Sequence, residues 1–194
     1  GVQTCALPIW HVVVSAGGTR EHLDPVRFLG NSSSGLMGLS LARAARLRGA
    51  RVTVVAAHLE RPVPSGCEVV PVISTADLDA AMTRLAPEAD VLVMAVAAPD
   101  FAPRAASNTK IKKESADSGL ELDLVQTTDV LKRLAHHRPR PQVIVGFAAE
   151  TAADEDDRVE ACSGLSRSGI HAPMMPASAG APDSLERAHE RANE

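Results

Sequence analysis

Short apolar runs alternate with amphipathic stretches along most of this 194-residue chain. Runs rich in valine and leucine are typical of strands that are buried on both faces of a parallel sheet. They predict strands at residues 11–16, 51–56, 68–72, 91–97 and 143–147. Because helical patterns separate these runs, the order of elements indicates an α/β fold whose sheet is covered on both faces.

The first helix is predicted from its periodicity and its end signal. Residues at i, i+4, i+7 and i+8 form one helical face, and here they are Met37, Leu41, Ala44 and Ala45. Gly49 stands at the position of a C-terminal cap.

Two further helices are predicted from their N-terminal caps. A hydroxyl side chain just before the first turn accepts a hydrogen bond from a free N–H group of the helix. The candidates are Ser74 or Thr75 for a helix that runs to about Leu85, and Thr127 or Thr128 for a helix that runs through Leu134.

Ligands of a parallel sheet bind beyond the carboxyl ends of its strands, so the loops after residues 16, 97 and 147 are the ones to examine. The first loop leads into Ser32-Ser33-Ser34-Gly35 before a helix, where N–H groups and the helix dipole favour an anion. This motif is neither GxGxxG nor Walker A, and helix capping by serine is the alternative. Gly17-Gly18-Thr19-Arg20 adds a glycine turn and a cation at the same strand end, which favours a phosphate site.

Composition narrows the class of protein. Hydrophobic residues make up 45% of the chain and aromatic residues only 2%, so valine, leucine, isoleucine and alanine have to build the core. The formal net charge of −4 offers no basic surface for nucleic acid, and no apolar run is long enough to span a bilayer. Cys5, Cys67 and Cys162 form neither a CxxC motif nor a disulfide framework. We therefore expect a soluble cytoplasmic protein that binds neither nucleic acid nor membrane.

The two ends differ in character from the middle. Residues 1–9 match the conceptual translation of a common sequencing adapter, so residues 1–10 are expected to be an artefact. A divergent strand or a weak signal peptide is the alternative, but a positive n-region and a cleavage site are missing. Residues 11–158 are expected to form the folded core. Periodicity disappears in residues 159–194, whose composition predicts a disordered tail, either natural or produced by a frameshift or truncation.

Four ordered segments carry a specific pattern. They are residues 15–21 with 24–27, residues 31–38, residues 97–101 with 110–113, and residues 145–151, and residues 124–130 fit as well. Over residues 12–158 this pattern resembles phosphopantothenoylcysteine synthetase, the ligase half of the bifunctional flavoprotein of coenzyme A biosynthesis. The resemblance implies a Rossmann-like three-layer α/β/α fold with a mainly parallel sheet, and a homodimer.

The resemblance also implies a reaction, the joining of 4′-phosphopantothenate to L-cysteine with CTP. The carboxylate of 4′-phosphopantothenate attacks the α-phosphate of CTP, which gives an acyl-cytidylate and pyrophosphate. The cysteine amine then displaces CMP. Mg²⁺ accompanies CTP and neutralises charge. FMN is expected only in the decarboxylase domain that is usually fused upstream and that this sequence does not include.

Specific site residues follow from the resemblance. Lys110 matches a lysine needed to form the acyl-cytidylate, and Asn31 matches an asparagine that serves its turnover. Asp100 matches an aspartate that contacts the nucleotide on the cytidine side. With Asp100 and Lys110, the residues expected to bind the nucleotide are Gly17, Gly18, Thr19, Ser33, Ser34, Gly35, Ala97, Phe147, Ala148, Ala149 and Glu150.

Each assignment has a structural alternative. Lys110 could be a solvated lysine on the polar loop of residues 99–119, a segment long enough to form a flap over a site. Asn31 could lie in a turn before the helix, and Phe147 could pack in the core. Arg20 either meets a phosphate or pairs with Asp24.

No metal site is predicted. Residues 154–157 form an acidic run that is expected at a solvated helix start, and His136-His137 are expected at an exposed helix end.

The sequence also departs from the family pattern. Ser32 and Leu36 replace residues that are often basic or imidazole, and Pro99 replaces a small residue before Asp100. After Thr151 the family's next helix, Ala-Asn-Asp strand end and lysine contacts are not recognisable, so the C-terminal strands and part of the CTP site are expected to be missing.

Two alternative functions therefore stay open. One is a non-catalytic fragment of the ligase. The other is a Rossmann-type oxidoreductase, although the sequence has no GxGxxG motif and carries Ala56-Ala57-His58 where an acidic residue would end the second strand.

Overall fold

The computed structural model describes residues 10–112, 119–136, 141, 143–147 and 170–171. Its central element is a six-stranded parallel sheet with the strand order β10-β9-β6-β1-β4-β5. The strands are β1 (His11–Ala16), β4 (Arg51–Ala56), β5 (Glu68–Pro71), β6 (Val91–Met94), β9 (Val143–Gly146) and β10 (Ile170–His171).

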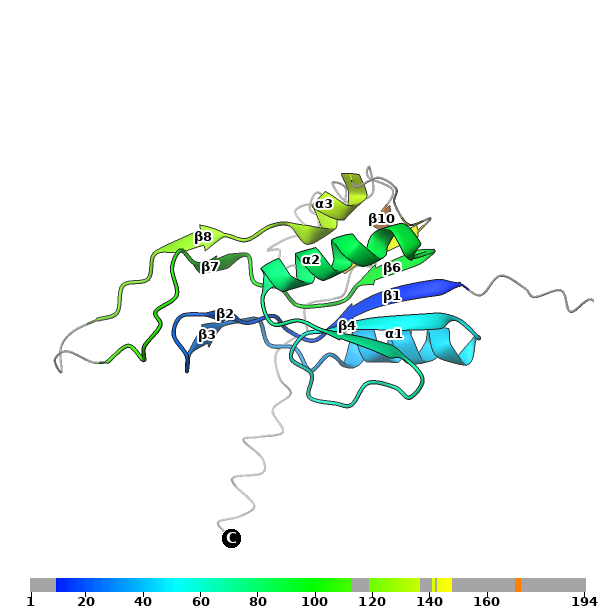
Figure 1. The fold of residues 1–194 in the computed structure, drawn as a ribbon, viewed down its shortest axis with the longest axis horizontal. Coiled ribbons are helices and arrows are strands. Elements are labelled where there is room, and N and C mark those ends of the chain that lie inside the picture. Colours follow the sequence, from blue (N-terminus) through cyan, green and yellow to red (C-terminus); the bar gives the residue numbers. More distant parts are fainter. Residues whose placement is uncertain (1–9, 113–118, 137–140, 142, 148–169, 172–194) are drawn as a thin grey trace, which may run out of the picture.

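Helices cover both faces of this sheet. Figure 1 shows α1 (Leu36–Leu47) on one face and α2 (Thr75–Leu85) with α3 (Val130–His136) on the other. A short 3₁₀ helix, η1 (Ala86–Glu88), follows α2. The Rossmann-like three-layer α/β fold is therefore confirmed. Within the part of the chain that the structure describes, every helix is too short or too polar to cross a membrane.

Strand β1 lies between β4 and β6 and supplies both faces of the core. Val13 and Val14 are completely buried and point to opposite faces, as neighbours on a strand must. Val13 packs in the core that includes Leu78 of α2 and Leu134 of α3. Val14 packs in the core beneath α1, which includes Leu39. Branched side chains fill a pleated surface well, so the valine runs suit these positions.

Helix α1 approaches β1 closely because a glycine faces the strand. A Cβ atom added at Gly38 would lie 2.7 Å from the Ala16 Cβ and 2.8 Å from the Ser15 carbonyl oxygen. Real Cβ atoms do not approach other atoms that closely, so glycine is required for this contact. Leu39 and Ala42 complete the buried residues of the helix.

The predicted buried face of α1 was partly wrong. Met37, Ala44 and Ala45 are half-buried, but Leu41 is 36% exposed. The buried residues of the helix are Gly38, Leu39 and Ala42, so its buried face is rotated away from Leu41. Gly49 follows the helix with a φ of 86°, as predicted for a C-terminal cap.

Helix α2 begins at Ser74, which confirms the first of its two predicted caps. The Ser74 hydroxyl accepts a hydrogen bond of 3.1 Å from the Asp77 N–H, and the Asp77 carboxylate accepts one of 2.9 Å from the Ser74 N–H. This reciprocal capping box satisfies two backbone donors that the helix itself leaves free.

Helix α3 is capped by a residue other than the two that we predicted. The Asp129 carboxylate accepts a hydrogen bond of 2.9 Å from the Lys132 N–H at the first turn. The Thr127 hydroxyl instead donates to the Pro99 carbonyl at 2.7 Å. The cap prediction was wrong because Thr127 is used in a contact with a segment that is distant in the sequence, and Asp129 is as good a cap as threonine.

Three strands of the main sheet end earlier than predicted, and one strand of this sheet lies where none was expected. β5, β6 and β9 end at Pro71, Met94 and Gly146, so the residues that follow β6 and β9 leave the sheet at its carboxyl edge. β10 pairs in parallel with β9 at the sheet edge. β10 falls in residues 159–194, for which the sequence predicted a disordered tail. The tail prediction is therefore wrong at residues 170–171, which add a strand to the sheet.

Two small antiparallel ribbons extend from the carboxyl edge of the sheet, on the left in Figure 1. One joins β2 (Glu21–His22) to β3 (Phe28–Leu29), and the other joins β7 (Phe101–Pro103) to β8 (Leu124–Gln126). We call the second ribbon the arm. Strand β7 lies in the loop that we predicted as a polar flap. The sequence did not reveal this strand because two or three residues are too few to show a strand periodicity.

Candidate functional site

The loop after β1 is fixed by hydrogen bonds to two neighbouring loops. The Thr19 N–H donates to the Ala97 carbonyl at 3.1 Å, and the Ala97 N–H donates to the Gly17 carbonyl at 2.8 Å. On its other side, the Gly18 N–H donates to the His58 carbonyl at 3.2 Å. The loops after β1, β4 and β6 therefore meet at one place, as predicted for the carboxyl edge of a parallel sheet.

Glycine is required at both positions of the pair in this loop. Gly17 has a φ of 93°, a conformation that L side chains rarely adopt. A Cβ atom at Gly18 would lie 2.9 Å from the Asn31 carbonyl oxygen. The two glycines thus allow the loop of residues 31–35 to lie directly against the end of β1.

Residues 31–35 form the glycine/serine loop that leads into α1. The Asn31 side-chain N–H donates to the Ala98 carbonyl at 3.0 Å. The Ser33 and Ser34 hydroxyls accept from the N–H groups of Gly35 and Leu36 at 3.3 and 3.4 Å.

The start of α1 differs from a helix capped by serine. Gly35 is the N-cap residue, has a φ of 76° and makes no side-chain capping hydrogen bond. The N–H groups of the first turn and the positive end of the helix dipole are therefore directed toward this loop, an arrangement that favours an anion.

Two adjoining cavities lie at this edge of the sheet. The first measures about 600 Å³ and is lined by the residues 31–37, 95–98, Asp100 and Phe147. The second measures about 560 Å³ and extends toward the arm and the start of α3. Both are lined by Val96, Ala98, Asp100 and Phe147, so these residues lie at the junction.

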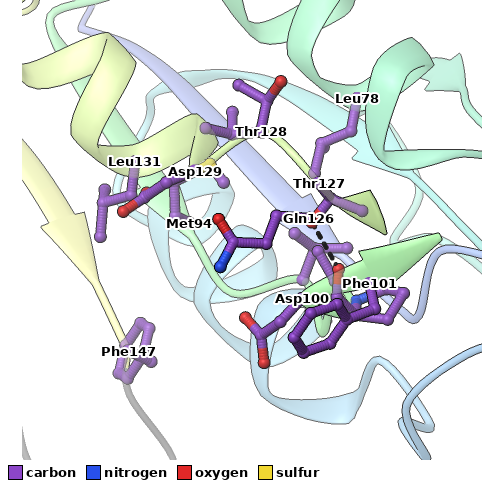
Figure 2. A pocket seen from close by; sticks show the side chains of 14 residues that line it. Leu78, Met94, Asp100, Phe101, Gln126, Thr127, Thr128, Asp129, Leu131 and Phe147 are labelled. Atoms are coloured by element: carbon purple, nitrogen blue, oxygen red, sulfur yellow. Dashed lines mark hydrogen bonds between the residues drawn. The ribbon is translucent and has the colours of Figure 1, made fainter. Parts of the chain in front are cut away.

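Figure 2 shows the second cavity, in which the side chains of Asp100 and Gln126 point toward the space that separates the base of the arm from Phe147. The Thr127 hydroxyl donates to Pro99, and the Thr127 N–H donates to the Asp100 carbonyl at 2.8 Å. These two bonds fix the backbone on either side of the Pro99–Asp100 peptide and hence the position of the Asp100 side chain.

The sequence analysis missed the second wall of this cavity. Gln126, Thr128 and Asp129 line it together with Thr127. The run of polar residues directly after a short apolar segment was the available signal. We counted residues 124–130 in the family pattern but assigned Thr127 and Thr128 only as candidate helix caps.

The structure brings most of the predicted site residues together. Those that line the first cavity are Asn31, Ser33, Ser34, Gly35, Ala97, Asp100 and Phe147. Gly18 and Thr19 line a smaller cavity of about 300 Å³ that shares Asn31 and Ser33 with the first. Phe147 is half-buried and also packs against the core beneath α1, so the core interpretation holds in part, and its contact with the nucleotide stays a prediction. Ala148, Ala149 and Glu150 lie outside the described residues.

Lys110 lies apart from these cavities. It is exposed, and it is not among the residues that line them. Its neighbour Ile111 donates an N–H to the Asp24 carboxylate at 3.1 Å. The Arg27 guanidinium donates to the Ile111 carbonyl at 3.0 Å.

Arg20 does not pair with Asp24, so this alternative from the sequence analysis was wrong. The Arg20 guanidinium lies over the Phe28 ring, 4.3 Å from its centroid, and lines the smaller cavity. Asp24 instead pairs with Arg27 at 2.7 Å. Arg27 lies on the same turn as Asp24 and so reaches it more easily than Arg20 does.

The Asp24 carboxylate is buried and accepts four hydrogen bonds. Its Oδ1 accepts from the N–H groups of Val26 and Arg27, and its Oδ2 accepts from the Arg27 side chain and the Ile111 N–H. Burial by itself raises the pKa of this carboxyl. The three backbone donors and the charge of Arg27 outweigh that effect and lower the pKa to about 2.

Within the described residues, no group of three or more histidine, cysteine, aspartate or glutamate side chains is placed to hold a metal ion. His136 lies at the exposed end of α3, where its ring contacts the Lys132 carbonyl at 2.8 Å, as expected for a helix end. His137 and the acidic run of residues 154–157 lie outside the described part of the chain.

Among the sequence relatives of this chain are several bifunctional CoaBC proteins. The coenzyme A biosynthesis bifunctional protein CoaBC of Mycobacterium tuberculosis is 46% identical over 165 residues, which cover 81% of this chain and 39% of that protein. The CoaBC protein of Bacillus subtilis is 42% identical over 142 residues, 73% of this chain and 34% of that protein. The chain thus spans well under half the length of these relatives.

Solved structures and a family model agree with this similarity. The C-terminal domain of a CoaBC protein superposes with a TM-score of 0.61 at 30% identity, over 78% of this chain and 69% of that chain. The DNA/pantothenate metabolism flavoprotein of Streptococcus pneumoniae gives a TM-score of 0.71 at 22% identity, over 87% and 83%. The model of the DNA/pantothenate metabolism flavoprotein C-terminal domain matches residues 8–168. On this match, which covers most of the chain, the protein belongs to the family of that C-terminal domain.

Proposed function

We propose that this protein catalyses the CTP-dependent ligation of 4′-phosphopantothenate and L-cysteine in coenzyme A biosynthesis. The observation that supports it most is the common cavity of Asn31, the glycine/serine loop and Asp100 at the carboxyl edge of the sheet. The similarity to CoaBC proteins supports the same pathway. A Cab2 variant solved in complex with phosphopantothenate-cysteine shares the fold, with a TM-score of 0.66.

In the proposed first step, a carboxylate oxygen of 4′-phosphopantothenate attacks the α-phosphorus of CTP. A new C–O–P linkage forms, the bond to the β-phosphate oxygen breaks, and pyrophosphate leaves. The start of α1 would face phosphate oxygens, and Asp100 would contact the cytidine side. The Lys110 ammonium would offset the charge that builds up when the carboxylate meets the triphosphate.

In the proposed second step, the amine of L-cysteine attacks the acyl carbon and CMP leaves with the bonding electron pair. The amide of Asn31 can donate to an acyl oxygen without changing the charge of the site. The cavity beside Asn31 is lined by backbone and small side chains of residues 95–98, which leaves room for the acyl group.

The residues of this site fit a magnesium ion that binds together with the nucleotide. Mg²⁺ in nucleotide sites is bound by phosphates with one or two carboxylates rather than by a cage of protein ligands. Asp129 lines the second cavity and is the carboxylate that would hold the ion, because Asp100 is assigned to the cytidine side. When bound, the ion would neutralise phosphate charge during the first step.

A homodimer is also part of the proposal. Large apolar side chains are exposed on the arm and on the residues just before β8. The exposed fractions are 49% for Phe101 in β7, 38% for Leu124 in β8, and 55% and 40% for Leu120 and Leu122 before it. Such a group of apolar side chains on a protruding ribbon is typical of a surface that a protein partner covers. A second copy of this chain is the proposed partner, and sedimentation analysis of Phe101→Ser against the wild type tests it.

The ligation is tested by pyrophosphate release. In the presence of Mg²⁺, the protein is expected to release pyrophosphate from CTP only when 4′-phosphopantothenate is present. It is expected to release CMP only when L-cysteine is added as well. Lys110→Ala is expected to lower pyrophosphate release at least ~100-fold, to a residual rate that single-turnover assays still measure. Release at the wild-type rate from Lys110→Ala would refute the role of this lysine, and a protein that binds CTP without releasing pyrophosphate would support the non-catalytic alternative.

A further inference from the structure

The segment that carries Lys110 is attached to the turn of residues 23–27 on both sides of the lysine. Before Lys110, the Ser107 N–H donates to the Leu23 carbonyl at 2.8 Å. After it, the Ile111 N–H donates to Asp24 Oδ2 at 3.1 Å. These contacts join residues that are more than 80 positions apart in the sequence.

Asp24 is the residue that links the turn to this segment. Oδ1 accepts from Val26 and Arg27 at 2.7 and 2.8 Å, which closes the turn itself. Oδ2 accepts from the Arg27 Nη1 at 2.7 Å and from Ile111, which lies beside Lys110. The two oxygens of one carboxylate thus perform separate tasks.

Arg27 completes the connection. The same Nη1 group donates to Asp24 Oδ2 and, at 3.0 Å, to the Ile111 carbonyl. Both backbone polar groups of Ile111 are therefore bonded to the turn. Hydrogen bonds to an ionised carboxylate are stronger than those between neutral groups, and the Asp24 side chain is fully buried.

We propose that Asp24 is a positioning residue for Lys110: its carboxylate anchors the backbone next to the lysine and so directs the ammonium group toward the nucleotide. This inference rests on the proposed function of Lys110. An exposed lysine on a loop has many accessible conformations, and a misplacement of about 1 Å can cost about 100-fold in rate. A fixed backbone at Ile111 removes much of that freedom.

The decisive variant is Asp24→Asn. Its side-chain oxygen can still accept from Val26 and Arg27, but its NH₂ group replaces Oδ2 and faces the donors of Arg27 and Ile111. We expect pyrophosphate release to fall about 10- to 100-fold in kcat, and amide hydrogen exchange to rise at Ile111 more than at Val26. Asp24→Glu keeps the charge but displaces it by one methylene, and is expected to show a smaller loss in the same direction.

Two comparisons separate positioning from a loss of stability. Asp77→Asn removes a capping carboxylate of α2 that bonds Ser74 and is expected to keep pyrophosphate release within about twofold. In a Lys110→Ala background, Asp24→Asn is expected to have no further effect, because the group that it positions is gone.

The possible outcomes are distinct. If Lys110→Ala shows the expected loss while Asp24→Asn keeps the wild-type rate, the positioning role is wrong and the proposed function stands. If the two substitutions act additively, Asp24 does not act through Lys110. If Lys110→Ala retains the wild-type rate, the proposed function of the lysine fails and this inference fails with it.

Discussion

The side-chain amide of Asn31 donates a hydrogen bond of 3.0 Å to the carbonyl of Ala98, 67 residues further along the chain. The bond connects the glycine/serine loop before α1 with the residues that follow β6. Both residues line the larger cavity, and Asp100 lies two positions beyond Ala98. The spacing between the loop that favours an anion and the acidic residue of the site therefore depends on this contact.

Asn31→Ala is expected to slow the second step of the proposed reaction more than the first. Removal of one donor to a reacting oxygen costs about 100-fold or more in enzymes that stabilise acyl intermediates. Pyrophosphate release in the first turnover should continue, while CMP release should fall and an acyl-cytidylate should accumulate. Rapid-quench analysis with labelled CTP measures both products. CMP release at the wild-type rate would contradict this role.

Asp100→Ala is expected to weaken CTP binding by about 10- to 150-fold, because a hydrogen bond to a charged group contributes about 1.5–3 kcal/mol. Titration calorimetry with CTP in the absence of 4′-phosphopantothenate measures the affinity. Asp90→Asn serves as the control, since Asp90 accepts from the N–H of His11, the first residue of β1, at 2.7 Å and thus lies at the opposite edge of the sheet. Equal affinity of wild type and Asp100→Ala would exclude Asp100 from the nucleotide site.

Gly38→Ala is expected to lower the free energy of unfolding by about 1–3 kcal/mol, the usual cost of added atoms in a packed core. The new Cβ would meet Ala16 and the Ser15 carbonyl at less than 3 Å, so α1 has to move away from β1. Urea unfolding followed by circular dichroism measures the change. Gly119→Ala is the matched control, because no described residue lies within 4 Å of its Cβ position. A neutral Gly38→Ala would mean that α1 does not lie this close to β1.

Acid is expected to destabilise the protein through Asp24 and Asp77. Hydrogen bonds from Ser74 lower the pKa of Asp77, and the pKa of Asp24 is lowered from 3.8 to about 2. A carboxyl whose pKa is lower in the folded state stabilises the protein above its unfolded pKa, and this stabilisation is lost as the pH falls through the folded pKa. Urea unfolding should thus show a decline from about pH 4 to pH 2 that is smaller in Asp24→Asn. An identical decline in both proteins would rule out this contribution.

Most of the sheet and its helices could be predicted because their signals are local. The valine runs gave β1 and β4 with their observed bounds, and Ser74 gave the start of α2. Burial on both faces selects continuous apolar runs, and a helix start needs an acceptor side chain at a fixed position. The glycine pair and the serine run likewise marked the loops that line the cavities.

Contacts between distant segments were not predictable in this way. Leu41 looked like a core residue by its spacing, but the contact of Gly38 with Ala16 orients α1 so that Leu39 is buried in its place. Thr127 looked like a helix cap, but its hydroxyl donates to Pro99, 28 residues earlier. In both cases a competing partner far away in the sequence decided between two locally acceptable arrangements.

The sequence by itself determined the α/β class, the alternation of five strands of the main sheet with the helices, and the loops in which the site lies, because burial and capping depend on residues that are close together along the chain. Only the tertiary structure decided that Asn31 reaches Ala98 and that Asp24 reaches the neighbour of Lys110. Hydrogen bonds of this kind depend on how the loops at the carboxyl edge of the sheet pack against each other. That packing is set by the whole sheet and leaves no periodic trace in the sequence.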